Sequence, residues 1–171
     1  MNALYLELVE RIRGEISDRD QVAQRVLAAW DRAKQMPGES AYLDSVALNL
    51  HGFYSGLECL FELIARHVDG VLPSSETWHR DLLRRMAEDV ASVRPAVLNQ
   101  ESALALDEFR RFRHLVRNVY TINLAPEKMV GLVSALPTLW STLRAELMAF
   151  ADFLEALGQA SPPPGEQTDT P

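Results

Sequence analysis

The chain has 171 residues, of which 47% are hydrophobic and 24% are charged, and its formal net charge is −7. This length and composition predict one domain with a sizeable core, and the acidic balance restricts any nucleic-acid contact to a local basic patch. No apolar run reaches the roughly 18 residues of a membrane span, no signal peptide is evident, and no glycine-rich motif for a nucleotide phosphate occurs. We therefore expect a cytoplasmic protein without a membrane segment.

Apolar residues recur at helical spacing along nearly the whole chain, and no segment alternates as a strand would. The first predicted helix covers about residues 2–35, with Gly14 and the Ser17-Asp18 pair as points where it weakens or breaks. Met36-Pro37-Gly38 ends it, because proline and glycine oppose continuation of a helix.

The second and third predicted helices each follow a serine. Ser40 is a suitable N-cap for a second helix whose apolar seam runs to Val68, and it carries the lone Cys59, interpreted as a core residue. After a loop, Ser75 is the expected cap of a third helix over about residues 76–93.

The last two predicted helices are separated by a short linker. A fourth helix runs from about Ser102 to Tyr120, and a fifth is opened by Pro126, with a kink or a displaced start at Pro137. The sequence thus predicts an all-α bundle of about five helices with an up-and-down core over residues 1–157. A disordered, proline-rich tail is expected over residues 158–171.

The fourth predicted helix gathers basic residues on one face. At about 100° per residue, His114 and Arg117 fall within roughly 40° of Arg110, while Arg113 lies about 60° to one side and Asn118 about 80° to the other. Arginine can hold a phosphate and histidine can move a proton, which are the two requirements for binding and cleaving RNA.

The alternative is that this stripe is only a solvated helix face. Two observations favour a function. Acidic residues that could pair with the arginines, Asp107 and Glu108, occur only at the start of the stripe. Asn118 is a mediocre helix former, so helix propensity does not explain why it is there.

Arg113-His114, Asn118 and Tyr120 form the pattern Arg-His-x-x-x-Asn-x-Tyr, which resembles the HEPN-domain signature. In that signature an arginine and a polar residue are followed, after three more residues, by a histidine, and in HepT toxins by a tyrosine two positions further on. Segments 51–58 and 72–86 also resemble the HepT-like branch, so the likeness covers about residues 40–157. It implies an HEPN-like fold and a toxin that cuts RNA without metal or cofactor.

Asn118 departs from that signature, because it stands where the family has its histidine. An amide has no pKa near neutrality and cannot serve as a general acid or base. Either His114, one turn earlier on the same face, takes over the proton transfer, or the chain binds RNA or a nucleotide without cleaving it. The candidate catalytic residues are Arg113, His114, Asn118 and Tyr120, with Arg110 and Arg117 as the phosphate-binding pair.

The resemblance also implies a partner. HepT-like toxins are paired with a small nucleotidyltransferase of the MNT type, which attaches AMP to the motif tyrosine, here Tyr120. The alternative role of Tyr120 is packing at the edge of the helix.

Three residues outside the fourth helix are secondary candidates. Tyr54 and Glu58 share a helix face, and the resemblance places them near the motif helix, where Glu58 would orient an arginine or form a salt bridge at the edge of the core. His79 is interpreted as a packing or capping residue. No histidine or cysteine spacing suggests a metal site.

The leading hypothesis is a HepT-like toxin that acts on RNA as a homodimer and is controlled by an MNT-type nucleotidyltransferase antitoxin. Its main rival is a non-catalytic HEPN module that binds this partner or a nucleotide. A purely structural helical adaptor is the third possibility.

Overall fold

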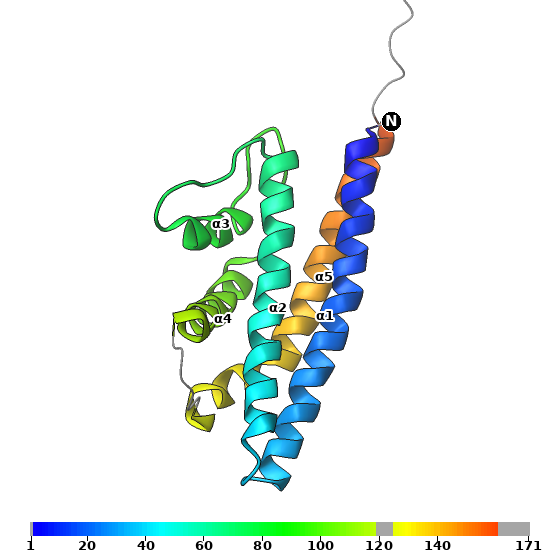
Figure 1. Ribbon diagram of the computed structural model, residues 1–171. Helices are drawn as coiled ribbons and strands as arrows, with labels where there is room; N and C mark the ends of the chain where they lie inside the picture. The colour runs from blue at the N-terminus through cyan, green and yellow to red at the C-terminus, as the bar shows by residue number, and fades with distance from the viewer. Residues whose placement is uncertain (1, 119–124, 161–171) are drawn as a thin grey trace, which may run out of the picture.

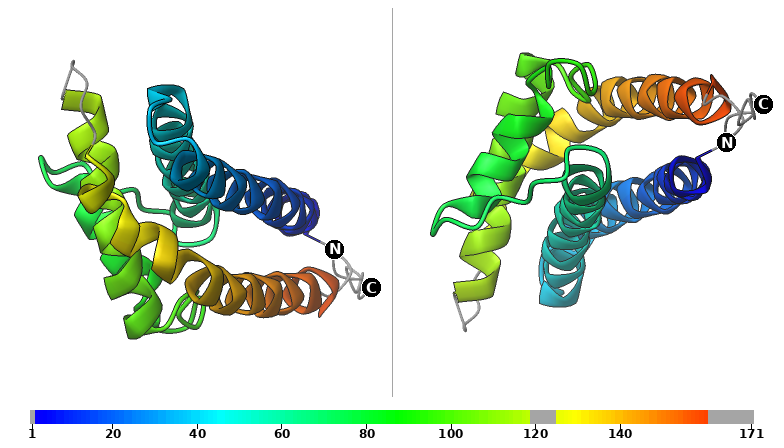
Figure 2. Two further views of the ribbon diagram at one scale, coloured as in Figure 1. Left: turned by 90° about the horizontal axis from the view of Figure 1, so that it is seen from below. Right: turned by 90° about the horizontal axis from the view of Figure 1, so that it is seen from above.

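The computed structural model describes residues 2–118 and 125–160, and three long helices form the body of this part. Helices α1 (Ala3–Gln35), α2 (Ser40–His67) and α5 (Val130–Ala160) lie side by side, with α1 antiparallel to the other two (Figure 1). The shorter helices α3 (Trp78–Met86) and α4 (Gln100–Asn118) lie on one side of α2 and run across the long helices (Figure 2).

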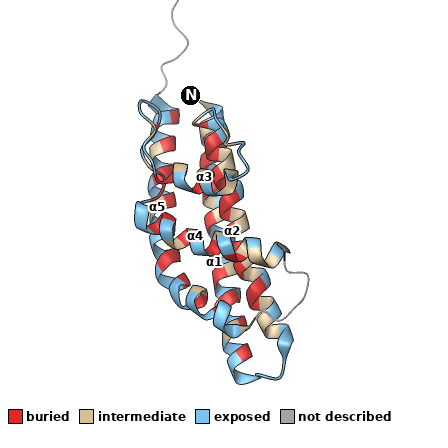
Figure 3. Cartoon of the chain, turned by 90° about the vertical axis from the view of Figure 1, so that its left-hand side faces the viewer, coloured by how far each residue is buried: buried red, intermediate tan, exposed pale blue. Residues whose placement is uncertain are grey.

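This arrangement confirms the predicted all-α fold of about five helices, and no β-strand occurs within the described ranges. Buried residues face the interior of the bundle, as the red segments of Figure 3 show. None of the described helices combines the length and the hydropathy that crossing a membrane requires.

An aromatic cluster fixes α4 against the body. The ring of Phe53 on α2 lies 5.6 Å from that of Phe109 on α4 and 5.7 Å from that of Trp140 on α5, with the second pair edge to face. Phe53 and Phe109 are almost fully buried. Because Phe109 is held in the core, Arg113, one turn later on α4, contacts α2.

The predicted weak point in α1 is absent, since the helix is continuous from Ala3 to Gln35. Gly14 and the Ser17-Asp18 pair lie on its exposed face, whereas Ile12 and Ile16 of the same stretch are buried. Burial of the apolar stripe therefore outweighs the roughly 1 kcal/mol that a glycine costs inside a helix.

Two predictions about α2 are wrong in detail. Ser40 is the first helical residue instead of the cap, and the capping position is occupied by Glu39, whose side chain makes no capping bond. Cys59 is exposed rather than part of the core. The pKa of its thiol is raised by desolvation and by neighbouring carboxylates, the first of which is Glu62.

Helix α3 is shorter than the predicted 76–93, because Arg94 captures the backbone where the helix ends. Its fully buried guanidinium donates to the carbonyl oxygens of Arg85 and Glu88 at 3.2 Å each and forms an ion pair with Asp69 at 2.6 Å. Ser92, with φ 62°, then reverses the chain. The position before the helix is Thr77, although Ser75 Oγ does donate to the carboxylate of Asp81.

The starts of α4 and α5 also differ from the sequence predictions. Asn99 Oδ1 accepts the Ser102 N–H at 2.7 Å, so Asn99 has the capping role that Ser102 was expected to play. Pro126 opens the short 3-10 helix η1 (Pro126–Lys128), and α5 begins at Val130 and continues through Pro137.

Helix α5 extends past the predicted domain end. Residues 158–160, assigned to the tail by their sequence, are helical; Gly158 is buried, and its carbonyl oxygen accepts the Asn2 N–H at 3.1 Å. Residues 161–171 of the predicted tail lie outside the described residues, as does Tyr120.

Candidate functional site

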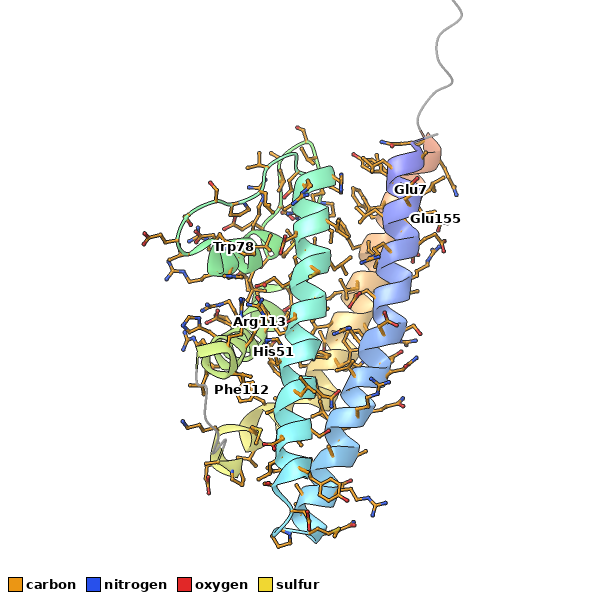
Figure 4. The ribbon with its side chains drawn as sticks, in the orientation of Figure 1. Glu7, His51, Trp78, Phe112, Arg113 and Glu155 are labelled. Atoms are coloured by element: carbon orange, nitrogen blue, oxygen red, sulfur yellow. The ribbon has the colours of Figure 1, made fainter. Side chains whose placement is uncertain are left out.

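A cavity of about 310 Å³ lies where α4 faces the start of α3. It is lined by basic and imidazole side chains: His79, Arg110, Arg113, His114 and Arg117. The predicted basic face of α4 therefore lines a concave site instead of facing open solvent. In Figure 4, Arg113 and His51 lie between α4 and α2, with Trp78 on α3 beside them.

A second cavity, of about 380 Å³, adjoins the first and shares three of its lining residues, His79, Arg110 and His114. Its other lining residues come from the start of α3 and the loop before it: Glu76, Thr77, Trp78 and Arg80. The two cavities together are large enough for an extended phosphate-containing ligand rather than a single anion.

Arg113 is held in place by two contacts with α2. Its Nε donates to Ser55 Oγ at 2.9 Å, and its terminal nitrogen lies 3.3 Å from a carboxylate oxygen of Glu58. The side chain is only 15% exposed. A guanidinium fixed in this way presents its remaining N–H groups in one orientation, which suits recognition of a phosphate.

Glu58 connects α2 with both α4 and α3. Its second oxygen lies 2.8 Å from His79 Nδ1, and the side chain is only 3% exposed. A carboxylate this deeply buried requires partners, and here an arginine and a histidine supply them. The placement of Glu58 beside an arginine of the motif helix agrees with the sequence expectation.

Arg110 and Arg111 share one carboxylate on their own helix. Arg110 Nε donates to Asp107 at 2.6 Å, and Arg111 Nε donates to the other oxygen at 2.8 Å. Burial works against ionisation of this carboxyl, but the two arginines overcome that effect and hold the pKa of Asp107 below its usual value. Asp107, in the middle of α4, therefore holds Arg110 beside the cavities, while Arg111 is exposed.

His51 is a half-buried imidazole on the α2 face beneath the cavity. Desolvation lowers its pKa, and the nearby positive charges of Arg113 and Arg117 lower it further, against the opposing effect of Glu58. Its charge state thus depends on the same arginines that line the site.

Tyr54 is fully buried, and its hydroxyl has no hydrogen-bond partner among the residues that the structure describes. Burial, followed by the charge of Glu58, raises the pKa of this phenol well above its ordinary value. Tyr54 therefore stays protonated and does not exchange protons at the site.

The structure brings together six of the predicted residues: Tyr54, Glu58, Arg110, Arg113, His114 and Arg117. Asn118 is the last residue of α4, and its side chain is outside the description, so its relation to His114 stays a prediction.

Two residues of the site, His51 and Ser55, were not predicted from sequence. They precede the predicted Glu58 by seven and three positions on α2, so their common face was detectable. The contact between His79 and Glu58 has no such signal, because the two residues lie on different helices. No group of three or more His, Cys, Asp or Glu side chains suited to a metal ion occurs in residues 2–118 and 125–160.

Comparison with known proteins identifies one family. A family model described as "HepT-like protein" matches residues 45–154, which include α2 from Ser45 onward, the whole cavity lining and most of α5. Neither a search of curated proteins nor a search of solved structures returns a match.

Proposed function

Because this chain belongs to the HepT-like protein family, we propose that it is the toxin component of a nucleotidyltransferase-linked toxin–antitoxin pair and acts on RNA. Cleavage is metal-independent in this proposal and takes place in the arginine-lined cavity. The proposal extends to a homodimer, an MNT-type antitoxin as partner and a cytoplasmic location.

One observation carries the choice of RNA. Three arginines and two histidines line a single cavity in a chain whose net charge is −7. Guanidinium groups bind the non-bridging oxygens of a phosphodiester and stabilise the negative charge that grows at phosphorus during cleavage. Imidazoles can transfer the protons of the attacking and leaving oxygens near neutral pH. A phosphodiester is thus the substrate that this set of side chains fits.

A second candidate is a non-catalytic HEPN module that binds its nucleotidyltransferase partner or a nucleotide. The observation that favours it is Asn118, which cannot move a proton as the family histidine does. Both candidates use the same arginines, so they differ in turnover rather than in binding.

The purified chain incubated with single-stranded RNA in excess EDTA tests the first candidate. We expect cleavage products from the wild type and a loss of at least about 100-fold in rate for Arg113→Ala and for His114→Ala. Arg111→Ala is the matched control, because Arg111 is exposed on the same helix outside the cavity lining. Intact RNA at every pH tested, with binding retained, would favour the non-catalytic module.

A separate experiment tests control by the partner. After incubation with a small nucleotidyltransferase of the MNT type and ATP, mass spectrometry should find AMP on Tyr120 of the wild type and no addition to Tyr120→Phe. An AMP adduct elsewhere, or none, would contradict the assignment of Tyr120.

A further inference from the structure

Two imidazoles from different helices line both cavities of the site. His114 belongs to the motif helix α4, whereas His79 stands at the start of α3. Arg110 lines the same two cavities. A phosphate bound to the arginines would therefore have an imidazole from each helix at the wall of its binding site.

His79 is held by its surroundings in a defined orientation. Its Nδ1 lies 2.8 Å from the buried carboxylate of Glu58, which accepts the Nδ1–H, so Nε2 is the nitrogen left for exchange with a ligand. The ring stacks on Trp78 with centroids 3.6 Å apart and planes 28° apart. These two contacts fix both the plane and the tautomer of the imidazole.

We propose that His79 and His114 form the acid–base pair for RNA cleavage, with His79 as the base and Glu58 as its positioning residue. This inference rests on the proposed function, and it identifies a second proton-transfer group for a motif that lacks its usual histidine. His79 is the base because the carboxylate of Glu58 stabilises the imidazolium that forms when Nε2 takes up a proton.

The reaction requires no further reactant. His79 Nε2 removes the proton of a ribose 2′-hydroxyl, and the 2′-oxygen forms a bond to phosphorus as the bond from phosphorus to the 5′-oxygen breaks. His114 donates a proton to that leaving oxygen, giving a 2′,3′-cyclic phosphate and a free 5′-hydroxyl. Arg113 and Arg117 neutralise the charge on the non-bridging oxygens in the transition state.

The charged groups that face His79 come from all the elements packed around it. They are Glu58 from α2, Arg110, Arg113, His114 and Arg117 from α4, and Glu76 and Arg80 from its own segment. Among the described residues, Glu58 is the one that forms an ion pair with the His79 ring. Removing its charge is therefore the most direct way to change the basicity of His79.

The test measures kcat/KM for an RNA dinucleotide as a function of pH in the wild type and five variants. We expect a bell-shaped profile for the wild type. His79→Ala should lower kcat/KM at least about 100-fold and abolish the acidic limb, and His114→Ala should abolish the alkaline limb. Glu58→Gln should move the acidic limb to lower pH.

Ser55→Ala is the matched control for Glu58→Gln. It removes the other α2 contact of Arg113 without touching His79, so it should weaken substrate binding and leave both limbs in place. His79→Gln keeps a hydrogen-bonding side chain at the site and should also lose the acidic limb. It provides the same test if the alanine variant does not fold.

If folded His79→Ala retains both limbs and activity within a few-fold of the wild type, the acid–base pair is refuted while RNA cleavage stands. If the wild type cleaves no RNA at any pH, the proposed ribonuclease function fails, and the pair fails with it.

Discussion

Glu58 places a negative charge beneath a cavity that is otherwise lined by cationic and imidazole groups. Its two oxygens contact Arg113 and His79, and only 3% of the side chain is exposed. Removing either partner would leave the carboxylate with less compensation in a poorly solvated position. The rigidity of the site thus originates in a residue that a ligand on the arginines need not touch.

His51 provides a prediction at the residue scale. Desolvation and the charges of Arg113 and Arg117 lower its pKa, so an NMR titration should give a midpoint below the ordinary value of about 6.5. Arg117→Gln should raise that midpoint, whereas Arg111→Gln should not, because the Arg111 side chain is exposed and paired with Asp107. An equal response to both variants would contradict the electrostatic explanation.

The sign of the effect on stability follows from the direction of the pKa shift. The unfolded chain takes up a proton on His51 at higher pH than the folded chain does, so protonation favours unfolding. Stability should therefore be fully present above about pH 6.5 and decline as the pH falls through the unfolded and then the folded pKa. A urea titration at a series of pH values, compared with His51→Gln, measures this contribution.

Sequence reasoning identified the arginines of the site but not all of its histidines. The basic face could be predicted because residues 110–117 belong to one helix, on which spacing alone determines which side chains share a face. His79 reaches Glu58 across 21 positions of sequence, through a loop and a change of direction. No periodicity describes such a contact, so it became visible only in the folded chain.

At the scale of elements, tertiary contacts in the loop after α3 determine where that helix ends. The Arg94 side chain is fully buried there, forms an ion pair with Asp69 and donates hydrogen bonds to backbone carbonyl oxygens at the end of α3. The spacing of apolar residues favoured a helix to residue 93, because such spacing carries no information about tertiary contacts like those of Arg94. The short α3 lets the chain turn back toward α4.

We expect Arg94→Met to destabilise the fold by about 3 kcal/mol, because it leaves Asp69 buried with only Arg85 as a partner. Urea unfolding followed by circular dichroism measures the change. Lys34→Met is the control: its ion pair with Asp31 is well exposed and should contribute no more than about 0.5 kcal/mol. Equal effects of the two substitutions would contradict a structural role for Arg94.

In the other helices too, features set by neighbouring residues were predictable from sequence, and features set by packing against other helices were not. The ends of α1 and α2 near residues 36–40 were predictable, because proline and glycine act locally. The continuity of α1 through Gly14 was not, because it depends on how Ile12 and Ile16 pack against other helices.

At the scale of the whole molecule, a net charge of −7 surrounds a small basic cavity. Long-range repulsion of RNA by the acidic surface competes with short-range attraction at the arginines. Binding should therefore be restricted to the cavity, rather than spread over the surface.

The salt dependence of RNA affinity tests this arrangement. If three arginines each neutralise one phosphate of a single strand, affinity should fall about twentyfold between about 50 and 200 mM salt. Reversal of charge at Arg110, Arg113 and Arg117 should remove most of the binding. Reversal at the exposed Arg11, Arg25 and Arg66 should change it little. Comparable losses in both sets, measured by fluorescence anisotropy of labelled RNA, would indicate non-specific attraction.

The stack of Trp78 on His79 gives the site an intrinsic fluorescence signal. A protonated imidazole in contact with an indole quenches its fluorescence, so the emission of Trp78 should fall as His79 gains a proton. The chain has two other tryptophans, Trp30 and Trp140, and a variant with phenylalanine at both isolates the signal. In that variant His79→Ala should abolish the pH-dependent quenching. Ligand arrival and proton uptake at this cavity could then be followed in real time, in stopped flow and without a label.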